Sequence, residues 1–148
     1  RVSKAHLDTM IEAVAFAKTN KIPLINFHMS QGVYFTLPDE KIFLFERYEN
    51  EYQKKLRDFA LQCSEAADGQ VALCIENTGL NHPFVHRAIE ALLQYSSFRL
   101  TWDIGHDYTA GNCDRVAFFF TCWNEFHFFD VTSESFAEKE RIFFRGVW

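Results

Sequence analysis

Four polar residues that could bind a metal ion or move a proton each lie at the end of a short apolar run of the sequence. They are His28, Glu76, Asp103 and His127. Taken singly, such residues more often cap a helix or satisfy a neighbour, so it is their joint pattern that favours a site. Two carboxylates and two imidazoles suit Mn, Zn, Fe or Co better than Ca. A metal bound there could polarise a carbonyl, ionise a water molecule or hold a phosphate.

A further histidine follows the third of these residues in the segment Asp103-Ile-Gly-His106. Gly105 lets the chain turn sharply after the apolar run. We therefore expect His106 to swing back beside Asp103, although an ordinary loop histidine would fit the same segment.

The elements that must position these residues alternate along the chain. Apolar residues at helical spacing predict helices, and short apolar runs between them predict strands. We expect parallel strands near residues 22–28, 71–76, 98–103 and 126–130. The helices are expected at 5–18, 39–63, 83–95 and 114–123, with a loop at 29–38 and no assignment for 131–148.

Strands alternating with helices indicate an α/β fold with a parallel sheet covered by helices. Right-handed crossovers place the carboxyl ends of all such strands at one edge, and that edge is where ligands bind in barrels and open sheets alike. The four polar residues should therefore converge on a single edge.

Composition narrows the class of protein. The chain has 148 residues, of which 48% are hydrophobic and 17 are Phe, so residues 1–148 are expected to form one domain with a sizeable core. The net charge of -5 and the lack of a Lys/Arg run argue against nucleic acid as a partner. No apolar run is long enough to cross a membrane, and no signal peptide is visible. The four cysteines form no Cys-x-x-Cys pair, which favours free thiols in the cytoplasm.

Three segments resemble the xylose-isomerase-like barrel superfamily, which includes sugar-phosphate isomerases and epimerases and endonuclease-IV-like proteins. They are Cys74-Ile-Glu-Asn77, Leu100-Thr-Trp-Asp-Ile-Gly-His106 and His127-Phe-Phe-Asp130. The resemblance covers about residues 1–131 and also includes His28. It implies a parallel (β/α) barrel of which about half is present.

The resemblance also implies roles for the residues. Glu76, Asp103 and His127 would be metal ligands, with Mn or Zn as the ion. Glu76 and His106 would be catalytic, and His28, His106 and Asn77 would contact a small carbohydrate. The implied reaction is isomerisation or epimerisation of a sugar or sugar phosphate through an enediolate, with Glu76 as ligand and base.

The chain departs from the family pattern in its last part. The family's fourth ligand, a Glu, should lie some thirty residues beyond His127, whereas the sequence ends at Trp148. Two alternatives therefore stand beside the isomerase: a metal-dependent phosphodiesterase acting on abasic DNA, and an inactive truncated barrel fragment. Half a barrel has open sheet edges, so we also expect a homo-oligomer or another association that completes the barrel.

Overall fold

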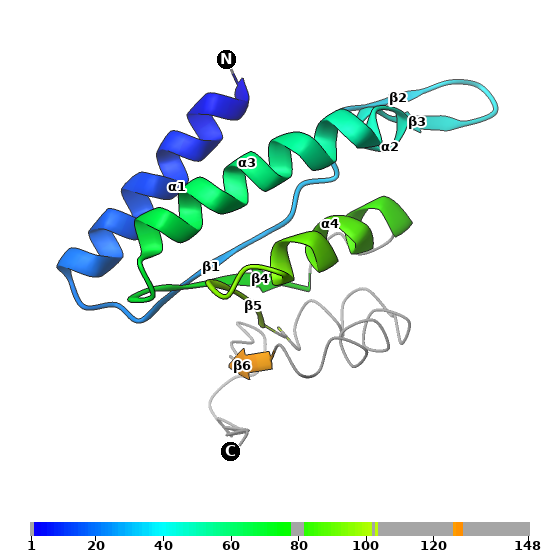
Figure 1. Cartoon of the computed structure of the whole chain (residues 1–148). Helices are drawn as coiled ribbons and strands as arrows, with labels where there is room; N and C mark the ends of the chain where they lie inside the picture. Colours follow the sequence, from blue (N-terminus) through cyan, green and yellow to red (C-terminus); the bar gives the residue numbers. More distant parts are fainter. Residues whose placement is uncertain (1, 78–81, 102, 104–125, 129–148) are drawn as a thin grey trace, which may run out of the picture.

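The computed structural model describes residues 2–77, 82–101, 103 and 126–128, and Figure 1 traces them. The chain has an α/β fold whose first element is a helix. The elements are α1 (Val2–Thr19), β1 (Leu24–Phe27), β2 (Tyr34–Thr36), β3 (Lys41–Phe43), α2 (Leu44–Arg47), α3 (Glu49–Ala67), β4 (Ala72–Glu76), α4 (Pro83–Leu93), β5 (Phe98–Thr101) and β6 (Phe126–Phe128).

The main sheet has the strand order β1-β4-β5-β6, and every neighbouring pair is parallel. Leu24 pairs with Ala72 across β1 and β4, and Leu73 pairs with Phe98 across β4 and β5. The four predicted parallel strands are therefore confirmed. Within the described residues they form an open sheet, so closure into a barrel stays a prediction.

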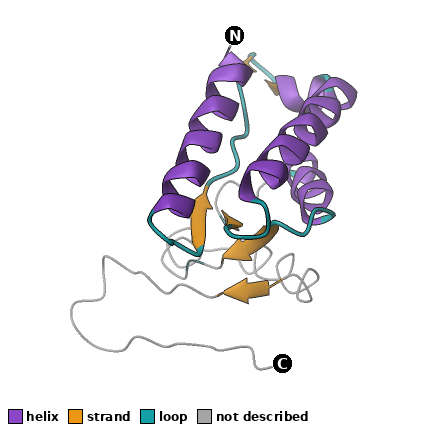
Figure 2. Cartoon of the chain, turned by 60° about the vertical axis from the view of Figure 1, so that its left-hand side comes forward, coloured by secondary structure: helices purple, strands orange, loops and turns teal. Residues whose placement is uncertain are grey.

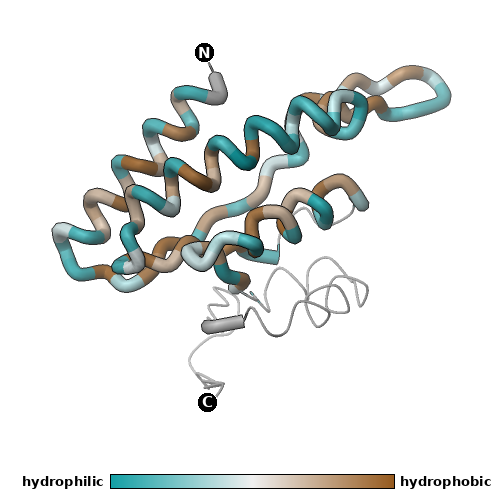
Figure 3. Tube along the Cα trace, viewed as in Figure 1, coloured by the Kyte–Doolittle hydropathy of each residue, from teal (hydrophilic) through white to brown (hydrophobic). Residues whose placement is uncertain are grey.

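The helices lie on one face of this sheet (Figures 1 and 2). Side chains alternate between the two faces along a strand. The face toward the helices carries Leu73, Ile75, Phe98 and Leu100, all with no exposed surface. These side chains form one core cluster with Val14 of α1, with Ala60 and Cys63 of α3, and with the buried side of α4. Figure 3 shows hydrophilic and hydrophobic residues interspersed along α1 and α3, as expected for helices with one buried side.

Helix α4 begins as the sequence predicts. Pro83 is its first residue, where the missing N–H of proline removes no helical hydrogen bond. His82 precedes it in an extended conformation, and its ring lies 4.1 Å from the ring of Phe43 between centroids. The predicted helix 83–95 is thus confirmed apart from its last two residues, because α4 ends at Leu93.

The prediction of a loop at 29–38 followed by one helix over 39–63 is wrong for residues 34–43, whereas residues 44–47 and 49–63 are helical, in α2 and α3. Strands β2 and β3 form an antiparallel hairpin there, with Tyr34 paired to Phe43, and α3 starts only at Glu49. Aromatic and β-branched residues favour strands on both sides of Pro38-Asp39, a pair that suits a turn. The amide of Leu37 donates to the carbonyl of Glu40 at 2.8 Å and closes that turn.

The hairpin extends beyond the end of α3 in Figure 1. Val33, Tyr34, Phe35 and Leu37 are all exposed, whereas Phe43 at its base is buried against His82 and Phe84. Only the base of the hairpin therefore belongs to the core. In the part of the chain that the structure describes, no helix is long and apolar enough to cross a membrane.

Candidate functional site

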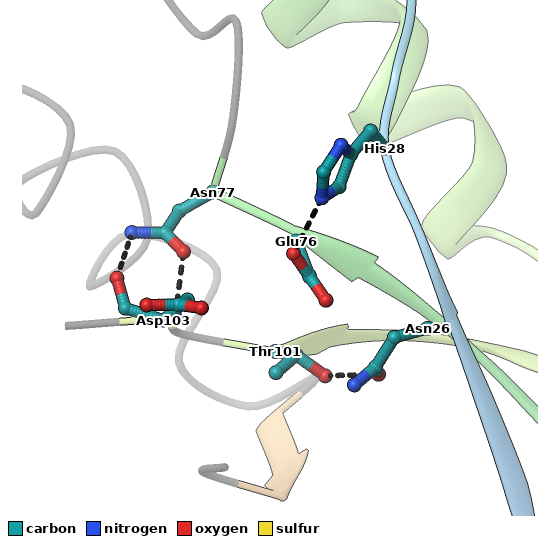
Figure 4. Close-up of polar contacts among 6 residues, drawn as sticks. All are labelled: Asn26, His28, Glu76, Asn77, Thr101 and Asp103. Carbon is teal, nitrogen blue, oxygen red and sulfur yellow. Dashed lines mark hydrogen bonds and ion pairs between the residues drawn. The ribbon is translucent and has the colours of Figure 1, made fainter. Parts of the chain in front are cut away.

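The carboxyl edge of the sheet carries four of the predicted site residues: His28, Glu76, Asn77 and Asp103. Glu76 is the last residue of β4 and is level with Thr101, the last residue of β5. His28 directly follows β1, and Asp103 lies two residues beyond β5. Figure 4 shows these residues together at the ends of neighbouring strands. The placement at one edge that parallel strands predict is therefore present for His28, Glu76 and Asp103.

His28 and Glu76 are in direct contact. The distance between His28 Nε2 and Glu76 Oε2 is 2.7 Å, and the two side chains point toward each other in Figure 4. An ionised carboxylate can only accept, so Nε2 carries the proton in this bond. The Glu76 side chain is 16% exposed and that of His28 is 57% exposed. The carboxylate therefore sits inside the edge, and the imidazole covers it from the solvent side.

Asn77 and Asp103 form the second contact at the edge. The side-chain amide Nδ2 of Asn77 donates to the carbonyl oxygen of Asp103 at 2.9 Å. The backbone N–H of Asp103 donates in return to Asn77 Oδ1 at 2.6 Å. Asn77 is only 1% exposed and Asp103 is half-buried, so the Asn77 side of this pair of bonds is shielded from water. Contact between Asn77 and a substrate stays a prediction.

The face of the sheet opposite the helices is polar, a feature that was not predicted from the sequence. Thr101 Oγ1 donates to Asn26 Oδ1 at 3.0 Å, and Thr101 is 2% exposed. Cys74 has no exposed surface and is level with Asn26 in the sheet. Burial raises the pKa of the Cys74 thiol, while a hydrogen bond with Thr101 and the charge of Arg99 oppose that rise. The alternation of side chains along the strands could have predicted this face, since its residues fall between the apolar positions of each strand.

The remaining predicted residues are only partly described. The backbone of His127 lies in β6, which pairs with β5 beside Leu100 and Thr101, but its side chain is outside the described residues. His106 also lies outside them. Among the described side chains, no group of three His, Cys, Asp or Glu residues is gathered closely enough to hold a metal ion. The three-ligand set therefore stays a prediction.

Comparison with known proteins gives no relative: no family model, no curated protein and no solved structure matches the chain. The resemblance to the xylose-isomerase-like superfamily accordingly stays an interpretation of the three sequence motifs.

Proposed function

We propose that this chain belongs to a metal-dependent sugar or sugar-phosphate isomerase or epimerase that works through an enediolate. The contact between His28 and Glu76 is the observation that carries the proposal. It joins a carboxylate and an imidazole at the carboxyl edge of a parallel sheet, on the face that the helices leave free. Asp103 adds a second carboxylate one strand away.

The residues fit a divalent ion in kind, because carboxylates and imidazoles are common ligands of Mn and Zn. In the proposed enzyme the ion, Mn or Zn, would be held by Glu76, Asp103 and His127. When bound, it would supply Lewis-acid polarisation of the substrate carbonyl.

The protein's own residues account for the proton transfer. Glu76 is an acceptor in its bond with His28, so its carboxylate can take a proton from a substrate carbon and return it to the neighbouring carbon. His28 is exposed and donates from the solvent side, a position from which it can also bind a substrate hydroxyl. His106 is proposed as the second catalytic group.

The bond between Thr101 and Asn26 supports a barrel-like curvature. These residues lie on β5 and β1, which are separated by β4. Strands two apart are about 9.6 Å from each other in a sheet, so their side chains must lean together over Cys74 to bond. Such contacts are typical of a concave inner face, which the proposed half-barrel would have.

The proposal also covers the association of this chain with another chain and its cellular compartment. Strand β1 pairs only with β4 among the described strands, so we propose that a second copy or another chain covers that edge and completes the barrel. Cys63 and Cys74 are buried free thiols, which suits the reducing cytoplasm.

Solvent deuterium exchange tests the function directly. The protein is incubated with Mn²⁺ and a panel of ketoses, aldoses and their phosphates in D₂O, and incorporation of deuterium next to the carbonyl is followed by NMR. We expect exchange with at least one sugar, and loss of that exchange in Glu76→Gln. Glu90→Gln is the matched control, since Glu90 is exposed on α4. No exchange across the panel, or equal exchange in Glu76→Gln, would refute the proposal, and cleavage of an abasic oligonucleotide instead would favour the phosphodiesterase.

A further inference from the structure

Asn77 bonds to the chain beyond β5 through its side chain. In the ladder between β4 and β5 the last pair is Glu76 with Thr101, and both strands end there. One residue further, the Asn77 amide bonds to both the N–H and the carbonyl of Asp103. A side-chain amide has one acceptor and one donor side by side, as a peptide group has. Asn77 therefore continues the sheet by one rung that the backbones do not make (Figure 4).

The chemistry of this rung restricts which residue can form it. Asp would accept from the Asp103 N–H but could not donate to its carbonyl, and Ala could do neither. Asn77 is 1% exposed and Asp103 is half-buried, so loss of the amide removes the partner of the Asp103 N–H and carbonyl at a largely buried position. The bonds hold the backbone of Asp103, and the direction of the Asp103 side chain follows from that backbone.

We infer that Asn77 is a positioning residue, which fixes the backbone of Asp103 and so sets where the Asp103 carboxylate stands at the site. This inference rests on the proposed function in one respect, namely that the Asp103 carboxylate holds the metal. The role differs from the substrate contact expected for Asn77, because the amide acts on another residue of the chain.

The test has one readout that depends on metal and one that does not. Amide hydrogen exchange at Asp103 is followed by NMR in the full chain, and Mn²⁺ affinity is followed from the electron paramagnetic resonance signal of the free ion. The variants are Asn77→Ala and Asn77→Asp. Thr101→Val is the control, because Thr101 is equally buried at the same edge and its bond goes to Asn26 instead.

We expect the Asp103 amide to exchange at least roughly tenfold faster in Asn77→Ala, since loss of a buried hydrogen bond weakens protection by about that factor. In Asn77→Asp the acceptor remains, so protection should persist. Mn²⁺ affinity should fall roughly tenfold or more in Asn77→Ala, the usual cost of removing a partner that orients a ligand. Thr101→Val should change both quantities much less than Asn77→Ala does, because the Thr101 hydroxyl bonds to Asn26 and not to Asp103.

The possible failures are distinguishable. Unchanged Asp103 exchange in Asn77→Ala would overturn the inference, and so would faster exchange with unchanged Mn²⁺ affinity. If wild type bound no Mn²⁺, the proposed function would fail, while the exchange data would still decide whether Asn77 holds Asp103. If Asn77→Ala did not fold, the comparison of Asn77→Asp with Thr101→Val would decide: loss of Mn²⁺ affinity in both alike would overturn the inference.

Discussion

The two faces of the sheet use the same strands for different purposes. Toward the helices, Leu73, Ile75, Phe98 and Leu100 have no exposed surface and belong to one apolar cluster. On the other face, Asn26 and Thr101 bond to each other, and Glu76 bonds to His28. Burial of apolar surface stabilises the first face, whereas hydrogen bonds orient polar groups on the second. Substitutions on the two faces should therefore separate stability from ligand binding.

The largest expected effect is on the helix-facing side. Phe98 is fully buried, and its ring lies 6.2 Å from Phe27 and 6.5 Å from Phe59 between centroids. Phe98→Ala should lower the free energy of unfolding by about 3–5 kcal/mol, because it removes apolar contacts and leaves a cavity. Thr101→Val on the other face should lower it by only about 1 kcal/mol, the worth of one hydrogen bond. Urea unfolding of both variants measures the difference. Equal losses of unfolding free energy would contradict the proposed division between the two faces.

The next effect concerns metal affinity, which should depend on the polar edge alone. Asp103→Ala should weaken Mn²⁺ binding roughly 100-fold, since losing a ligand should cost at least as much as losing a residue that orients one. Chelator should reverse the binding in wild type. Isothermal calorimetry with Mn²⁺ checks this, with Asp58→Ala on the exposed side of α3 as the control. If Asp103→Ala bound Mn²⁺ as tightly as wild type does, the proposed metal site would be refuted.

Alkaline pH should distinguish the two buried thiols. Burial raises the pKa of Cys63, on the apolar side, from an ordinary 9.0 to about 12. Between pH 9 and 12 the unfolded chain has therefore lost this proton and the folded chain has kept it. The free energy of unfolding should fall by about 1.4 kcal/mol per pH unit on account of Cys63.

Urea unfolding from pH 8 to pH 10.5 measures that slope. Cys63→Ala should flatten it clearly. Cys74→Ala should flatten it less, because Thr101 and Arg99 oppose the rise in the pKa of Cys74. Slopes are compared rather than absolute stabilities, since either substitution also removes buried volume. A steeper slope in Cys63→Ala than in wild type would contradict the assignment.

The smallest effect lies outside both faces, between α3 and α4. Arg87 donates to Glu49 through Nε at 2.5 Å and through Nη2 at 2.7 Å. The hydrogen bond from Arg87 lowers the pKa of Glu49 below its ordinary 4.5. The ion pair between Arg87 and Glu49 therefore stabilises the fold above pH 4.5. This stabilisation is lost as pH falls through the pKa of Glu49 in the folded state. Glu49→Gln should lower the melting temperature slightly at pH 7 and not at all in strong acid, with exposed Glu51→Gln as the control.

Much of the fold could be predicted because the apolar runs are short and well separated. Val71 to Ile75 is buried at four of its five positions, so its strand stands out in the sequence. The hairpin was missed because Ile42, Leu44 and Phe45 continue the helical spacing of α3 backward. Residues 33–37 also carry exposed apolar side chains, which no burial argument would assign to a strand. Local turn chemistry at Pro38-Asp39 was the better signal.

Less of the site could be predicted, because contacts depend on register. The position of Glu76 at a strand end follows from the sequence, and so does that of Asp103. The offset between β4 and β5 places Glu76 level with Thr101 and lets Asn77 reach Asp103. The apolar composition of the two strands does not determine this offset. The bond of His28 to Glu76 likewise depends on the pairing of β1 with β4 across an intervening hairpin and helix.

That long crossover has a consequence for the order of folding. Asn77 and Asp103 are 26 residues apart, whereas His28 and Glu76 are 48 apart. Closing the longer segment costs only about 0.5 kcal/mol more in chain entropy, but it also waits for the hairpin and α3 to form. We expect β4, α4 and β5 to form the early nucleus and β1 to dock onto it late. The edge would then be assembled in two kinetic steps, with the rung at Asp103 in place before His28 closes over Glu76.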